Sequence, residues 1–202
     1  MRSGTRAAGI AVSDGETTAT VCGAVVRADR VLDGLAFGEC TVGGTDATAT
    51  VASLSVVADR PDVQYVLCAG LAPAWFNLLD LHRLHERADC PVLSVSFEAS
   101  PGLDPALREQ FDGDALAERR AIYERQPPRR RVVLDADAAE TGTGEGSADA
   151  ADAVWVRAVG CDHETAAAVV RAYTPAGSGR PEPLRVARLA ARAGRTYGGD
   201  DE

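Results

Sequence analysis

Apolar runs and turn signals divide the first third of the chain into short strands. The sequence is largely apolar over residues 6–13, 18–27 and 31–42, and short polar connections at 14–15 and 28–30 separate these runs. Apolar runs joined by such short turns are typical of antiparallel strands. We therefore expect three consecutive antiparallel strands at the start of the chain.

The next third changes to an alternation of helix and strand. The pattern predicts a helix over 47–58, a buried strand over 63–69, a helix that runs through residue 84 and a strand over 91–97. Thr45 or Asp46 can cap the first of these helices. Strand, helix and strand in succession imply a parallel pair with a right-handed crossover.

The last third is mainly helical around one polar segment. The spacing predicts helices over 103–110, 114–125, 162–173 and 181–193 and a strand over 154–159. Residues 135–152 hold small and acidic residues without a basic one, which predicts a disordered acidic insertion. The whole succession predicts one domain over 1–202 of the α/β class, with a five-stranded mixed sheet flanked by helices. It resembles the ribonuclease H-like order, in which the first strand lies centrally beside the fourth.

Composition adds an acidic, lysine-free character. All 21 basic residues are Arg, against 30 Asp and Glu, and the net charge is −9. Acidic surfaces poor in Lys stay hydrated in concentrated salt, so we hypothesise a halophilic protein whose melting temperature rises in molar KCl. The alternative is an acidic mesophilic protein from an Arg-favouring genome. The acidic average argues against loose binding to DNA, although a local basic strip could still bind phosphates.

The cysteines and the lengths of the apolar runs indicate the cellular compartment. Five widely separated cysteines without a C-x-x-C pair predict buried, reduced thiols. No signal peptide opens the chain, and no apolar run is long enough to span a bilayer. These features predict a cytoplasmic protein.

Carboxylate and amide side chains follow the predicted strands. Asp14 ends the first strand, Asp46 opens the first helix, and Asn77 and Asp80 follow the fourth strand. If the first strand is central, these oxygens can approach one another and suit Mg²⁺, which prefers hard oxygen ligands. The alternative is structural, because Asp14 before Gly15 is a common turn pair and Asp46 is a common helix cap.

A basic strip stands out in the otherwise acidic chain. Its members are Arg119, Arg120, Arg125, Arg129, Arg130 and Arg131. Arginine binds phosphates bidentately, so the strip is a candidate nucleic-acid contact. Pairing with Glu118 and Glu124 along a solvated helix explains its first half equally well.

Other motifs carry weaker signals. His82 and His85 lack the spacing of zinc hydrolases, and an exposed helix face explains them better. Trp75 and Phe76 could stack on a base, but core packing is the favoured interpretation. The sequence contains no Walker loop, dinucleotide-binding glycine motif or hydrolase elbow. A nucleotide-processing hydrolase therefore ranks last among the candidate functions.

Four segments together resemble an archaeal family named endonuclease dU, a distant relative of endonuclease V. They are residues 23–27 with 32–34, 42–48, 70–80 and 181–187. The last segment, which reads PEPLRVA, is the most specific. The resemblance covers nearly the whole chain except residues 135–152.

The resemblance implies a ribonuclease H-like endonuclease that cleaves DNA at deaminated bases such as deoxyuridine with Mg²⁺ or Mn²⁺. It implies Asp14, Asp46 and Asp80 as catalytic residues, with Asp14 and Asp46 as metal ligands. By the resemblance, Asn77 and Arg185 would contact the substrate, which is single-stranded or damaged DNA. The basic strip, with Arg119, Arg120, Arg129 and Arg130, would hold the phosphate backbone.

The chain departs from the family pattern at two places. It keeps one acid after the first strand, at Asp14, where the family shows two. Gly70 and Leu71 stand where an aspartate is expected after the fourth strand. The thinned carboxylate set leaves an alternative open: a non-catalytic nucleic-acid or protein-binding module on the same fold.

Overall fold

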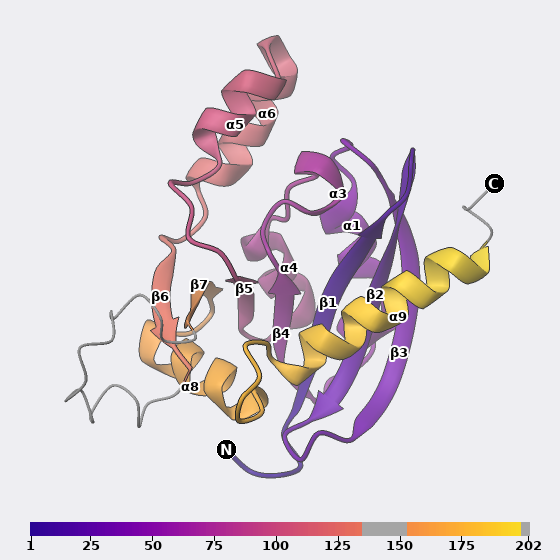
Figure 1. Ribbon diagram of the computed structural model, residues 1–202, viewed down its shortest axis with the longest axis vertical. Coiled ribbons are helices and arrows are strands. Elements are labelled where there is room, and N and C mark those ends of the chain that lie inside the picture. The colour runs from indigo at the N-terminus through magenta and orange to yellow at the C-terminus, as the bar shows by residue number, and fades with distance from the viewer. Residues whose placement is uncertain (135–152, 199–202) are drawn as a thin grey trace.

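Seven strands form one mixed sheet in the computed structural model, which describes residues 1–134 and 153–198 (Figure 1). The order across the sheet is β3-β2-β1-β4-β5-β7-β6. The strands are β1 (Arg6–Asp14), β2 (Thr18–Arg27), β3 (Leu32–Thr41), β4 (Val63–Ala69), β5 (Val92–Ser96), β6 (Arg130–Val133) and β7 (Ala153–Val159). The first strand lies centrally and pairs in parallel with β4, as predicted.

The sheet is wider than the five strands predicted. Strand β7 pairs antiparallel with β5, and β6 pairs antiparallel with β7 at the edge. Strand β6 was not predicted, because its four residues follow Pro127 and Pro128 within the arginine strip. The predicted acidic insertion at 135–152 lies outside the described residues.

Helices cover both faces of the sheet. They are α1 (Ala47–Ser53), α2 (Ser55–Ala58), α3 (Pro73–Phe76), α4 (Leu81–Ala88), α5 (Asp104–Gln110), α6 (Gly113–Glu124), α8 (His163–Tyr173) and α9 (Glu182–Gly198). The larger core cluster joins residues of α1, α2 and α4 to β1, β2 and β4. The second joins α8 and Leu184 of α9 to β4, β5 and β7. Figure 1 shows α5 and α6 as a pair that projects beyond the sheet.

Two predicted helices differ from the structure. The helix predicted over 47–58 breaks at Leu54, whose extended ψ of 132° separates α1 from α2. The helix predicted after β4 is right-handed only over α4. Residues 74–76, which lie within α3, instead have positive φ angles of 45°, 50° and 61°, so α3 is a left-handed turn and not a right-handed helix.

Helix α9 crosses β1 and β2 at very short range (Figure 1). A Cβ atom on Gly9 of β1 would lie 2.2 Å from the carbonyl carbon of Pro183, so only glycine fits at this crossing. Leu184, Ala187 and Ala191 form the buried stripe of the helix. The PEPLRVA segment therefore fixes the position of α9 on the central strand.

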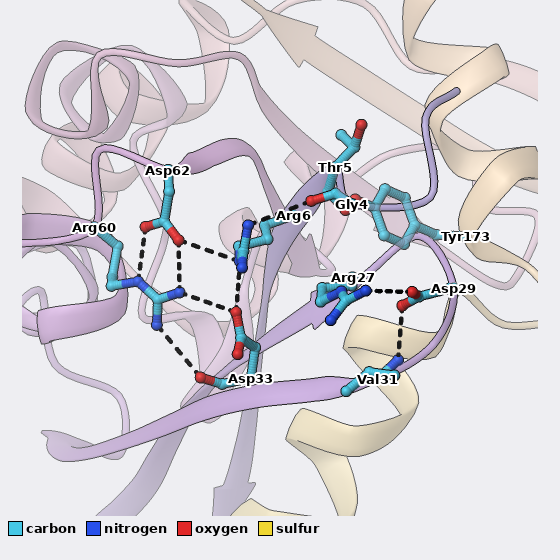
Figure 2. A network of polar contacts seen from close by, with 10 residues as sticks. All are labelled: Gly4, Thr5, Arg6, Arg27, Asp29, Val31, Asp33, Arg60, Asp62 and Tyr173. Atoms are coloured by element: carbon cyan, nitrogen blue, oxygen red, sulfur yellow. Dashed lines mark hydrogen bonds and ion pairs between the residues drawn. The ribbon is translucent and has the colours of Figure 1, made fainter.

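An ion-pair network joins the elements at the amino end of β1 (Figure 2). Arg6 Nε donates to Asp33 at 2.5 Å, and Arg60 donates to Asp62 through Nε and Nη2, both at 2.8 Å. Arg60 also reaches Asp33 at 3.3 Å. Hydrogen bonds from Arg60, which outweigh partial burial, lower the pKa of Asp62 to about 2.

All five cysteines lie among the described residues as free thiols, and four are buried. Burial raises the pKa of Cys22 to about 11 and that of Cys68 to about 12, which keeps these thiols protonated at neutral pH. Among the described helices, none has the length and hydropathy needed to cross a membrane.

Candidate functional site

A cleft of about 1040 Å³ opens at the carboxyl ends of β1, β4 and β5. Asp14 ends β1, Gly70 follows β4, and Glu98 lies two residues beyond β5, and all three line the cleft. Carboxyl ends of adjacent parallel strands are where open α/β sheets place ligands. The cleft is therefore the candidate functional site.

Six arginines line this cleft, and we call them the cleft arginines. They are Arg129, Arg157, Arg180, Arg188, Arg192 and Arg195. Three come from α9, where the spacing 188, 192, 195 places them on one side of a helix. The buried stripe of α9 faces the sheet, so one helix supplies both core contacts and cleft charge.

The cleft arginines lack acidic partners among the described residues. The arginines that form ion pairs lie elsewhere, at Arg6, Arg27, Arg60, Arg108, Arg120, Arg125 and Arg185. Partial burial and the charges of Arg188 and Arg192 hold the pKa of Arg180 below its ordinary value. Partial burial and Arg157 do the same to Arg129. The cleft therefore holds mutually repelling cations in a protein of net charge −9.

Neutral contacts hold several of these guanidinium groups in place. Arg180 stacks on the Phe97 ring at 3.9 Å, and Arg129 donates to the Ser100 carbonyl oxygen at 3.0 Å. Arg157 donates to the Tyr123 hydroxyl oxygen at 3.2 Å. Carbonyl, hydroxyl and ring partners orient arginines without neutralising them, so the positive charge stays available to an anion.

Asp14 is the predicted carboxylate that lies in the cleft. Its side chain is exposed and has no hydrogen-bond or ion-pair partner among the described residues. Arg195 donates to its backbone carbonyl oxygen at 3.0 Å, which places that guanidinium beside the end of β1. The Nε atom of Arg195 is buried and has no hydrogen-bond partner within residues 1–134 and 153–198.

Asp46 is engaged by its neighbours. Its carboxylate accepts from Thr41 N and Oγ1 at 3.1 and 2.9 Å, and from Asn77 Nδ2 at 2.6 Å. Partial burial opposes ionisation, but these donors outweigh it and lower the pKa of Asp46. Burial raises the pKa of the Cys40 thiol to about 11, and the negative charges of Asp46 and Asp14 raise it further.

Asn77 ties the chain after β4 to the start of α1. Its side chain is fully buried, accepts from Ala47 N at 2.9 Å and donates to the Thr41 carbonyl oxygen at 2.8 Å. Asn77 therefore supplies the side-chain cap of α1 that Thr45 or Asp46 was expected to supply. These contacts engage the Asn77 side chain within the protein, and Asn77 does not line the cleft.

Asp80 is the N-cap of α4. Its carboxylate is 2% exposed, accepts from His82 N at 3.3 Å and forms an ion pair with Arg125. Asp80 does not line the cleft. The structure therefore does not bring the three predicted catalytic aspartates together, and Asp80 has a capping role.

Only one of the predicted substrate-binding arginines lines the cleft, namely Arg129. Arg120 pairs with Asp104 and Glu124, Arg185 pairs with Glu182, and Arg130 lies in edge strand β6. Residues close together in sequence differ here because Arg120 belongs to α6 and forms ion pairs, whereas Arg130 belongs to β6. The structure therefore does not unite the predicted strip.

Arg119 is buried and clamps the turn after β4. Its guanidinium donates to the carbonyl oxygens of Phe76 at 3.3 Å and Gly44 at 3.2 Å, and also to Gly43. It stacks on the Phe111 ring at 4.0 Å. With 5% of its surface exposed, Arg119 supports the structure and is not available to a phosphate.

The turn that Arg119 clamps presents Trp75 to the cleft. Three successive non-glycine residues with positive φ cost of order 1–3 kcal/mol each, and such strain concentrates at functional sites. The Trp75 side chain is 50% exposed and lines the cleft. The prediction of core packing for Trp75 is therefore wrong.

The sequence carried a signal for part of this site. The recurrence of arginine at 188, 192 and 195 follows the helical period and could have been read as a charged stripe. Arg157 and Arg180 offered no such signal, because they come from a strand and a loop that meet the cleft only in the folded chain.

The donors present do not form a preassembled metal centre. Among the described residues, no group of three or more His, Cys, Asp and Glu side chains could hold an ion. Asp14 alone offers an uncommitted carboxylate at the end of β1, with Glu98 lining the same cleft. Such a set fits one ion of the Mg²⁺ type, which takes one or two carboxylates and completes its shell with water and substrate phosphate.

The fold and cleft define an α/β protein with a cationic groove at the carboxyl edge of a mixed sheet. The model of the family described as endonuclease dU matches residues 3–194, and the chain belongs to this family. A UPF0215 protein of Methanopyrus kandleri is 30% identical over 174 residues, which cover 86% of this chain and 81% of the relative. A UPF0215 protein of Thermococcus kodakarensis is 32% identical over 174 residues, covering 85% and 78%.

Solved structures share the fold. A protein of unknown function from Archaeoglobus fulgidus superposes with a TM-score of 0.74 at 22% identity, over 94% of this chain and 97% of that one. Endonuclease V of Ciona intestinalis, in complex with DNA containing an inosine, gives 0.56 at 14% identity over 96% and 86%. Endonuclease V of Bacillus subtilis gives 0.56 at 12% identity over 100% and 84%. The predicted ribonuclease H-like fold is thereby confirmed.

Proposed function

We propose that this protein is an endonuclease that cleaves the phosphodiester backbone of DNA containing deaminated bases, with deoxyuridine as the expected lesion. The observation that carries the proposal is that the cleft arginines, which have no acidic partner in the described part of the chain, line the same cleft as the exposed carboxylate of Asp14. Membership of the endonuclease dU family supports the same reaction.

The cleft arginines serve to bind the phosphate backbone. Their mutual repulsion in the free protein is relieved when an anion enters, and guanidinium groups bind phosphate oxygens bidentately. Because three of them follow one side of α9, they can contact successive phosphates of an extended strand. The protein can thus bind DNA locally although its overall charge would repel it.

Asp14 is the proposed catalytic carboxylate. It would hold a single Mg²⁺ or Mn²⁺ ion, which when bound polarises a phosphodiester and lowers the pKa of an attacking water. Arg195, held against the Asp14 carbonyl oxygen, lies where it can bind the negative charge of the phosphate. Asp46 does not line the cleft, and its carboxylate is committed to Thr41 and Asn77, so we assign it to positioning the loop before α1.

The direct test is cleavage of an end-labelled DNA that carries one deoxyuridine. The reactions contain Mg²⁺ or Mn²⁺, and matched strands carry deoxyinosine or only normal bases. We expect nicking beside deoxyuridine that stops when a chelator removes the metal. Cleavage that ignores the base, or requires none of the metals, would contradict the lesion or metal part of the proposal.

A binding module without catalysis is the second candidate. The single uncommitted aspartate at the end of β1 favours it. DNA that is bound by the cleft but not cleaved with any metal would support this candidate. A Mn²⁺ titration separates the two, because a module needs no metal site that depends on Asp14.

A further inference from the structure

We infer that Trp75 forms a stacking site for an unpaired nucleobase at the wall of the arginine cleft. This rests on the proposed function, since it concerns the nucleic acid held in that cleft. The site would make the protein select strands whose bases are free to leave the stack. Phosphate contacts alone cannot do this, because they carry no information about the base.

The first observation is that the turn holds Trp75 outward. Ala74, Trp75 and Phe76 all have left-handed backbone angles, which L-residues adopt rarely, and almost never in succession. A right-handed helix would be the ordinary continuation after Pro73. The structure instead maintains an unfavourable turn whose central residue is a half-exposed tryptophan.

The second observation is that the turn is rigidly supported from behind. Gly43 N donates to the Ala74 carbonyl oxygen at 2.7 Å, and Arg119 donates to that of Phe76. The Trp75 ring packs against Phe111 and Phe76, with centroids 5.3 and 5.9 Å away. A rigid aromatic platform loses little conformational entropy when a base stacks on it.

The third observation is that Gly43 makes room for the ring. A Cβ atom on Gly43 would lie 2.8 Å from Cε3 of Trp75, and Gly43 itself has a φ of 71°. The loop before α1 and the turn after β4 therefore fit each other around the indole. Core packing does not require this fit, because half of the Trp75 surface stays in contact with solvent.

The fourth observation is the charge beside the ring. Trp75 lines the same cleft as Asp14 and the cleft arginines. A π surface next to a phosphate-binding groove is the combination by which proteins hold single strands, since every base has a face that stacks. Protein partners would have to place many negative charges beside an aromatic contact, so a nucleic-acid strand fits better.

The test uses tryptophan fluorescence. The chain has two tryptophans, so Trp155→Phe leaves Trp75 as the reporter and keeps an aromatic ring under Arg129. A short single-stranded oligonucleotide is compared with an abasic oligonucleotide of equal length and phosphate number, in chelator to prevent cleavage. We expect quenching by the first and none by the second, and none by a duplex of the same sequence.

Variants give the affinity. Trp75→Ala should weaken binding of the base-containing strand about 5- to 100-fold and leave the abasic strand unchanged. Trp75→Phe should retain most of the affinity. Phe37→Ala is the matched control, because Phe37 is 52% exposed on β3 and does not line the cleft. Melting curves of all variants verify folding.

The outcomes separate the two proposals. Equal binding of the two strands by the wild type, or equal losses on both in Trp75→Ala, would overturn the stacking site while leaving phosphate binding intact. Failure to bind either strand in dilute salt would overturn the proposed function together with the stacking site. A Trp75→Phe protein that is folded but as weak as Trp75→Ala would also contradict stacking.

Discussion

Arginine has different roles at the two ends of the central strand, β1. At the amino end of β1, Arg6 and Arg60 share Asp33 and Asp62 in a closed network (Figure 2). At the carboxyl end, six arginines surround a cleft without an acidic partner among the described residues. The same residue type therefore serves structure at one end and remains available at the other.

This contrast provides a criterion for recognising a binding surface in an acidic protein. A paired arginine has its charge neutralised within the fold, and its pKa rises. The pKa of Arg60 is raised in this way, mainly by its hydrogen bond to Asp62. The pKa values of Arg129 and Arg180 are instead lowered, by partial burial and by the charges of neighbouring arginines. Unfavourable local arrangements that persist in a folded protein are expected at functional sites.

The largest effect is expected at Asp14. Asp14→Asn should lower cleavage about a hundredfold or more without changing the melting temperature, because the carboxylate is exposed and unpartnered. Asp46→Asn should instead lower the melting temperature, since an amide would face the Asn77 donor. Cleavage rates and melting curves of the two variants decide this. Full activity in Asp14→Asn would remove Asp14 from the site.

The next largest effect is expected at Arg119, which is buried and does not line the cleft. Arg119→Ala leaves the carbonyl oxygens of Gly43, Gly44 and Phe76 without their donor and should lower the free energy of unfolding by about 2–3 kcal/mol. Arg120→Ala, at the exposed pair with Asp104, should cost less than about 1 kcal/mol. Urea denaturation measures both. Similar losses for the two variants would contradict the clamp.

A smaller effect tests the comparison between the two ends directly. Arg192→Ala should weaken DNA binding about tenfold and reduce the slope of log affinity against log salt by about 1. Arg60→Ala removes an arginine from the paired end and should leave affinity and slope unchanged. Arg83→Ala, on the exposed side of α4, is a second control. Equal losses for Arg192→Ala and Arg60→Ala would mean that net charge alone governs binding.

Most of the sheet could be predicted from the sequence, because apolar runs and turn residues specify strands locally. Strands β1, β2 and β4 fall within a residue of their predicted bounds. The left-handed turn at 74–76 could not be predicted, because Arg119 and Gly43 impose it from distant parts of the chain. Local spacing at Leu78, Leu81 and Leu84 indicated a helix there.

The candidate site was only partly predictable for a related reason. The end of a strand can be predicted where an apolar run gives way to turn residues, and Asp14 was placed correctly at the end of β1. Clustering in sequence, however, is a poor guide to clustering in space. Within the strip at 119–131, Arg119 supports the turn after β4, Arg120 and Arg125 form ion pairs, and only Arg129 lines the cleft. The cleft arginines come instead from β7, α9 and the loops before β6 and α9.

The smallest effect concerns acid stability at the paired end. The folded-state pKa of Asp62 is lowered to about 2, so its carboxylate contributes stability that is present above its ordinary pKa of about 3.9. That contribution is lost as the pH falls from about 4 to about 2. Because the side chain is 40% exposed, solvent screening keeps the contribution below about 1 kcal/mol. Asp62→Asn and Arg60→Ala should each reduce the change of the urea denaturation midpoint over this pH range. The double variant should show no further reduction than either single variant. Additive reductions would mean that the two residues act separately and that the network in Figure 2 does not stabilise this end of the sheet as one unit.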